Sequence, residues 1–262
     1  MRPSAAHALF DMAVSACDLP KPISPLGAFA NRSRSAILRN ARSPYLSAMR
    51  RSKSLGLWLA LAGPGLIALL SVLALQLTDT LVLRAIFLVA FALLLVAVYR
   101  RASGPEGISA KRLGLRPLRL QSLLIAGGLT AFFIFVFGPF AYGLVDWLDL
   151  GDFSTGLSRL DGLPVWYLLL TILIVAGGEE WLYRCYAIER LTDLTGSIWL
   201  AGMISLAVFV VVHYPLWGLG PTLTVILSGA ILTVAYILTR DIHALVIAHI
   251  ATDIYGLLIT PS

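Results

Sequence analysis

Charged residues are scarce in this sequence. Of its 262 residues only 13% are Asp, Glu, Lys or Arg, whereas 58% are hydrophobic, and the mean hydropathy is +0.86. A soluble domain of this size does not carry so much apolar surface. The composition therefore excludes the common soluble classes and indicates a protein that spans a membrane several times.

Cysteine and acidic residues are also in short supply. Cys17 and Cys185 are the only cysteines, too few for a disulfide framework or a cysteine metal site. No acidic residue occurs from residue 19 to residue 78, and the formal net charge is +6. Because the basic residues cluster between apolar stretches, the positive-inside rule explains them, and we expect the lipid bilayer rather than nucleic acid as a partner.

The N-terminal region, residues 1–54, contains nine Lys and Arg among many Ser, Ala and Pro residues. Three interpretations are open: a disordered cytoplasmic arm that helps to orient the protein, an organellar transit peptide, or translated sequence upstream of the true start. A cleaved secretory signal is disfavoured, because the apolar stretch that follows is long enough to cross the bilayer.

Seven apolar stretches follow this arm, and they predict an all-α, polytopic transmembrane helical bundle with about seven spans. No internal repeat is visible. Residues 55–110 hold two N-terminal spans, and residues 111–262 hold the rest. The expected spans are 55–77, 81–99, 120–142, 163–180, 198–213, 219–238 and 242–259.

The connections between the spans differ in charge. The one after the second span holds six basic residues and one Glu, whereas the one after the third holds four Asp and one Arg. Lys and Arg favour the cytoplasmic side of a membrane. We therefore expect a cytoplasmic N-terminus in a multi-pass protein of a bacterial inner membrane or plasma membrane.

Two adjacent carboxylates, Glu179 and Glu180, lie at the end of the fourth apolar stretch. A charge at bilayer depth costs at least about 2.5–3.5 kcal/mol on insertion scales, so such a pair indicates a functional site. Arg184 is four residues after Glu180 and can pair with it on the same helix face. This leaves Glu179 free to act as a general base.

Three further polar side chains lie on other spans. His213 is on the fifth span, four residues after Phe209, while His249 and Asp253 share a face of the seventh. At 1.5 Å per residue, Glu179, His213, His249 and Asp253 lie about 18, 24, 12 and 18 Å from the inner helix ends. These depths overlap, so we expect one site inside the bundle. A base that activates water and histidines that stabilise an oxyanion suit hydrolysis, plausibly of an amide.

The three motifs occur in order on separate apolar spans, and together they resemble the CAAX prenyl protease and bacteriocin-processing family of intramembrane proteases, related to the Ras-converting enzyme. The segment Leu113-Gly114-Leu115-Arg116 is also similar to a frequent feature of that family. The resemblance covers roughly residues 111–260, so 111–262 is the expected CAAX-protease-like domain. The motifs are Glu179-Glu180-x-x-x-Arg184, Phe209-x-x-x-His213 and His249-x-x-x-Asp253.

The resemblance implies an endopeptidase that acts on a membrane-associated peptide or protein, such as a prenylated CAAX tail or a leader peptide. It implies that Glu179 activates water with the help of His213, and that His249 and the residue four positions later hold the scissile carbonyl. Glu180 and Arg184 are implied to be a supporting pair.

Asp253 departs from the pattern, because the prenyl-protein enzymes usually have asparagine at this position. An ionised aspartate cannot donate a hydrogen bond to an oxyanion. Asp253 would instead orient His249 or His213, or bind a divalent cation such as zinc together with both histidines and Glu179. Whether the reaction uses such a cation or no cofactor stays open, and the spacing is not that of HExxH zinc proteases.

Other interpretations compete with an enzyme. A non-catalytic membrane scaffold or a bacteriocin-immunity protein could have the same fold. An ion-coupled transporter would also place Glu, His and Asp at mid-depth, but it should show repeats or broken helices in matching halves. Locally, His213 precedes Tyr214 and Pro215, which also suits a histidine that caps a helix at the membrane interface.

Overall fold

The computed structural model describes residues 44–151 and 153–259, and of residues 44–54 and 155 the backbone alone. The predicted N-terminal arm lies largely outside the described residues. Residues 48–262 form one compact unit. This part of the chain is helical without strands, and seven of its helices are long and apolar enough to cross a membrane. The predicted all-α transmembrane bundle is therefore confirmed.

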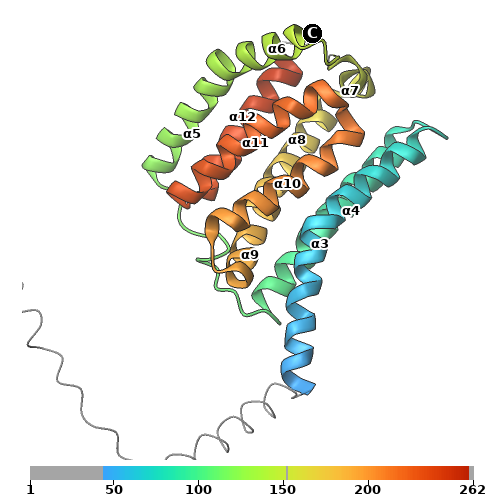
Figure 1. Cartoon of the computed structure of the whole chain (residues 1–262). Coiled ribbons are helices and arrows are strands. Elements are labelled where there is room, and N and C mark those ends of the chain that lie inside the picture. Colours follow the sequence, from blue (N-terminus) through green and yellow to red (C-terminus); the bar gives the residue numbers. More distant parts are fainter. Residues whose placement is uncertain (1–43, 152, 260–262) are drawn as a thin grey trace, which may run out of the picture. The chain divides into compact units, whose positions relative to one another are not determined.

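Several expected spans consist of more than one helical element, because three of the long helices contain a π-helical segment, named η1, η3 and η4 here. Figure 1 labels the α-helices. The elements are α3 (Pro44–Leu75), α4 (Leu81–Ser103), α5 (Leu120–Phe132), η1 (Phe133–Phe137), α6 (Gly138–Trp147), α7 (Ser154–Leu157), the 3₁₀ turn η2 (Ser158–Leu160), α8 (Val165–Glu179), η3 (Glu180–Ala187), α9 (Ile188–Thr195), α10 (Ile198–Trp217), α11 (Leu219–Thr239), α12 (Ile242–Ile254) and η4 (Tyr255–Ile259).

Three expected spans begin where α4, α10 and α12 begin, and polar caps mark these starts, whereas α4, α9 and α10 end later than the apolar stretches. Thr80, Ser197 and Asp241 accept hydrogen bonds from backbone N–H groups in the first turns of α4, α10 and α12. Gly196, with φ of 72°, ends α9 in the left-handed conformation. The fourth span consequently continues past Glu180 through η3 and α9.

The fifth span also continues further than expected. α10 runs to Trp217 and contains Pro215 in its last turn. His213 is therefore an internal residue of a helix, and the alternative of a helix-capping histidine is wrong.

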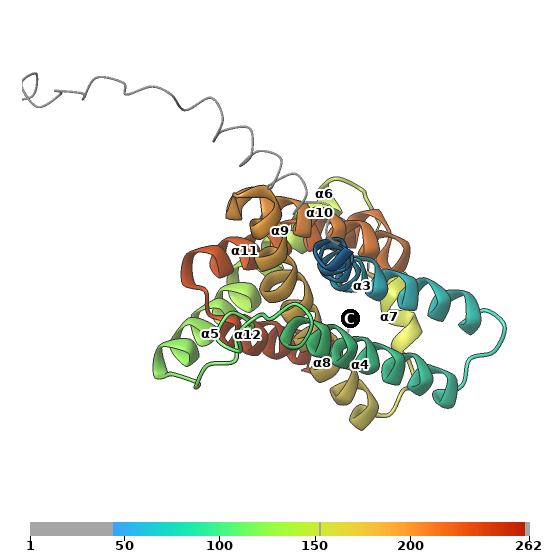
Figure 2. The same cartoon turned by 90° about the horizontal axis from the view of Figure 1, so that it is seen from below.

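The helix that carries the two glutamates is central to the packing. α12 packs between α5 and α8, while α10 packs against α11 and η3, and α4 packs against α8. Figure 2 shows α8 next to α12, with α4 beside α8. The side chains of η3 are the most completely buried, and Leu182, Cys185 and Tyr186 have no exposed surface. The core is thus built around η3, whereas large apolar side chains such as Phe135 remain exposed on the outside, as suits a surface that faces lipid.

The connection between α4 and α5 packs under η3. Leu113 is fully buried, and its carbonyl accepts a hydrogen bond from Trp181 Nε1 at 3.1 Å. Gly114 has φ of +74°, and a Cβ there would lie 2.4 Å from Ile242 Cγ2 and 3.3 Å from Cys185 Sγ. Only glycine both adopts this positive φ and leaves room for the neighbouring side chains. The connection between α4 and α5 therefore packs closely against η3, the segment that begins with Glu180.

Candidate active site

The two glutamates are adjacent in sequence but have different surroundings. Glu179 is the last residue of α8, and Glu180 is the first of the π-helix η3, in which hydrogen bonds skip one more residue than in an α-helix. The Glu179 side chain is 15% exposed, whereas that of Glu180 is 0% exposed. Glu179 therefore remains accessible, while Glu180 is part of the core.

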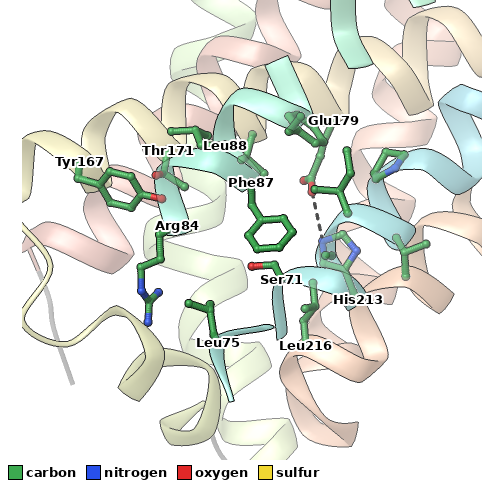
Figure 3. Close-up of a pocket in the computed structure, with 16 residues that line it drawn as sticks. Ser71, Leu75, Arg84, Phe87, Leu88, Tyr167, Thr171, Glu179, His213 and Leu216 are labelled. Carbon is green, nitrogen blue, oxygen red and sulfur yellow. Dashed lines mark ion pairs between the residues drawn. The ribbon is translucent and has the colours of Figure 1, made fainter. Parts of the chain in front are cut away.

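Glu179 faces His213 across a short gap (Figure 3). Its Oε1 lies 3.7 Å from His213 Nε2. The other ring nitrogen, Nδ1, lies 2.7 Å from the carbonyl oxygen of Phe209. Because a carbonyl oxygen only accepts, Nδ1 carries the proton of this hydrogen bond. In the neutral imidazole, Nε2 consequently presents a lone pair toward Glu179.

Glu180 holds two partners at once. Its Oε1 lies 3.2 Å from Arg184 Nη1 and 2.9 Å from His249 Nδ1. The structure thus contains the predicted pair of Glu180 and Arg184. The sequence did not predict the contact between Glu180 and His249, because it depends on how η3 packs against α12 and not on spacing along one helix.

Phe209 connects the two halves of the site. The guanidinium carbon of Arg184 lies 4.1 Å from the centre of the Phe209 ring, and the centre of the His213 ring lies 4.2 Å from it. Arg184 also donates to the carbonyl oxygen of Gly229 at 3.5 Å. The spacing of Phe209 and His213 therefore places an aromatic face between the buried arginine and the accessible histidine.

His249 lies between two carboxylates. Its Nδ1 contacts Glu180, and its Nε2 is 3.8 Å from Asp253 Oδ2. The second distance exceeds hydrogen-bond range. The Asp253 side chain is 35% exposed. The structure accordingly brings together the residues that the three motifs predicted for the site.

The predicted metal ligands form pairs and not one cluster. Glu179 is paired with His213, and His249 with Glu180 and Asp253. Among the described residues, no group of three or more His, Cys, Asp or Glu side chains is arranged to hold one ion. A zinc site needs at least three protein ligands around a single point, so this arrangement does not fit one. Metal dependence stays a prediction of the sequence.

A cavity of about 200 Å³ starts at Glu179 and His213 and is bounded by α3, α4, α8 and α10. Its far end contains Arg84, which the motif analysis missed although a lone arginine in an apolar stretch is a visible signal. Arg84 makes two hydrogen bonds to Asp79, from Nε at 2.6 Å and from Nη2 at 2.7 Å. These bonds hold the pKa of Asp79, which lies outside the spans, below its usual value.

Comparison with known proteins gives one family match. Residues 161–255 match the model of the family described as Type II CAAX prenyl endopeptidase Rce1-like. No curated protein and no solved structure matches significantly. The matched segment contains every residue of the three motifs, from Glu179 to Asp253, and excludes α3, α4 and α5. Residues 161–255 of this multi-pass membrane protein are thus similar to the type II CAAX prenyl endopeptidase Rce1-like family, which is a family of proteases.

Proposed function

We propose that this protein is an intramembrane endopeptidase in which Glu179 activates water to hydrolyse a peptide bond of a membrane-associated substrate. The observation that carries this proposal is the pair of Glu179 and His213, which is accessible at one end of a cavity inside the bundle. The family match supports the reaction class.

The geometry of the pair suits a bridging water. A separation of 3.7 Å between Glu179 Oε1 and His213 Nε2 is too long for a direct hydrogen bond but leaves both atoms free to hold one water molecule. Glu179 would accept a proton from this water as its oxygen attacks the carbonyl carbon. The proton would then pass to the amide nitrogen as the C–N bond breaks, so that Glu179 returns to its starting state.

His249 is placed to stabilise the oxyanion. Its Nδ1–H donates to Glu180, so when Nε2 is also protonated, the imidazolium and Arg184 are faced by two carboxylates, Glu180 and Asp253. The Nε2–H would then donate to the developing oxyanion. Asp253, at 3.8 Å from this nitrogen, would orient the ring in place of the asparagine of related enzymes.

The substrate and the orientation are further parts of the proposal. A prenylated CAAX tail fits the family match, while a leader peptide is the alternative. The basic connection between α4 and α5 favours a cytoplasmic N-terminus in a bacterial inner membrane or plasma membrane.

A comparison of new protein C-termini in cell membranes tests this function. Membranes from cells that express the wild-type protein should contain C-termini that are missing with Glu179→Ala. The exposed Asp146 offers a matched control, and Asp146→Asn should give the wild-type set. If wild type and Glu179→Ala give identical sets, the result contradicts the proposal and supports a non-catalytic scaffold.

A further inference from the structure

The cavity extends well beyond the catalytic pair. Figure 3 shows Glu179 and His213 at one end, Arg84 and Tyr167 at the other, and Phe87 between them. The walls between the two ends are mostly apolar, and many of them belong to α3 and α4, outside the segment that matches the family. A ligand that enters here would meet water-activating groups at one end and a cation at the other.

Arg84 lines the cavity and is paired with Asp79, a residue of the connection between α3 and α4. Among the described residues that line the cavity it is the only Lys or Arg. It lies in the first turn of α4, where a positive charge is unfavourable for the helix dipole. Its side chain is only 12% exposed. Arg84 lies near the end of its span, where an arginine can reach the membrane interface. Its low exposure and its place in the wall of the cavity therefore point to a binding function more than its charge does.

The guanidinium already holds a carboxylate in the geometry that a ligand would use. Asp79 reaches it from the connection between α3 and α4 and accepts two parallel hydrogen bonds. Such a fork-like contact is how arginine selects carboxylates. The Asp79 side chain is 55% exposed, and an ion pair with so exposed a partner contributes little. Another carboxylate can therefore replace it at small cost.

The spacing along the helices sets the length of the ligand. Phe91 packs against Gly178, next to Glu179, and Arg84 is seven residues from Phe91, or about 10 Å along α4. Tyr167, at the Arg84 end, is twelve residues from Glu179, or about 18 Å along α8. An extended peptide covers about 3.3 Å per residue, so about three to five residues span this distance.

We propose that Arg84 binds the C-terminal carboxylate of the substrate, displaces Asp79, and so places the scissile bond about three to five residues from the C-terminus at Glu179. The position of the cleaved bond rests on the proposed function, whereas the carboxylate site does not.

Binding of two forms of one peptide tests this site. The probe is a fluorescent peptide that ends in five apolar residues, made as a free acid and as a C-terminal amide, with purified Glu179→Gln protein in detergent so that it stays intact. We expect the acid to bind about ten- to a hundredfold more tightly, as a charge-assisted hydrogen-bonding pair would give. This preference should disappear in Arg84→Gln and persist in Arg100→Gln, which changes an exposed arginine on the same helix.

Substitution of Asp79 provides a second, independent test, in which the affinity for the acid peptide should rise and not fall. Asp79→Asn removes the competing carboxylate, so the acid should bind several-fold more tightly than in the parent protein, although a salt bridge has been lost. A merely structural ion pair would give no gain. If Arg84→Gln does not fold, this variant decides the question, and unchanged affinity for the acid overturns the proposal.

Cleavage by the protein with Glu179 intact separates the two proposals. Selective binding of the acid without cleavage of any peptide would refute the endopeptidase and leave the carboxylate site supported. Cleavage of acid and amide with equal kcat/KM, together with equal binding, would overturn the role of Arg84 and leave the endopeptidase supported.

Discussion

At the scale of single residues, Glu180 combines two tasks. It is fully buried, and one of its oxygens contacts both the Arg184 guanidinium and the His249 ring. Removing it would leave the equally buried Arg184 without a counter-charge. Glu179 is partly exposed and makes one long contact, so no buried charge depends on it.

We therefore expect Glu180→Ala to lower the free energy of unfolding by about 3–5 kcal/mol, the cost of an uncompensated buried charge. Glu179→Ala should have a much smaller effect. Equilibrium unfolding in detergent micelles measures both. The double variant Glu180→Ala/Arg184→Met removes both charges and should be more stable than Glu180→Ala alone. Equal destabilisation by the two single variants would show that the two carboxylates do not have separate roles.

The sequence was enough to nominate candidate residues that the structure places near one another, but it predicted only some of their contacts. Spacing along one helix was enough for the pair of Glu180 and Arg184. The contact between Glu180 and His249 joins residues that are far apart in the chain, and it depends on the packing of η3 against α12. Arg84 belongs to neither the motifs nor the matched segment, so its place at the end of the cavity required the structure.

At the scale of helical elements, the junction of α8 and η3 decides how closely α4 approaches the site. Two glycines precede Glu179. A Cβ on Gly178 would lie 2.7 Å from Phe91 and 2.8 Å from Leu95 on α4, whereas a Cβ on Gly177 would lie 3.7 Å or more from its neighbours on α12. The first distances are too short for carbon atoms, and the second are ordinary contacts.

This difference makes the two glycines a matched pair for an experiment. Gly178→Ala should be destabilising by about 1–3 kcal/mol, because the added methyl group overpacks the contact with α4. Gly177→Ala should be neutral, or stabilising by up to about 1 kcal/mol, since alanine favours the helix. Unfolding measured under the same conditions for both variants tests this, and an equal effect at the two positions would contradict the close approach of α4.

At the scale of the whole molecule, hydropathy was enough to predict the number and order of the spans. It predicted the starts at Leu81 and Ile242, but not the end of the fourth span, because that helix continues past the apolar stretch through η3 and α9 to the cap at Gly196. It also gave no sign of η3, since a π-helical turn arises from how a helix packs and not from a distinct composition. The cavity could not be predicted either, because it depends on how these helices pack. Residues of α3 and α4 form one wall of it, and Glu179 lies at one end.

The central claim is that Glu179 activates water for peptide hydrolysis at this cavity. The most direct measurement is cleavage of an S-farnesylated CAAX peptide by purified protein, followed by mass spectrometry of the products. We expect the wild-type protein and Asp146→Asn to cleave the peptide near its C-terminus, and Glu179→Gln to be slower by at least about a hundredfold, the usual contribution of a general base. Cleavage by Glu179→Gln at the wild-type rate would contradict the claim.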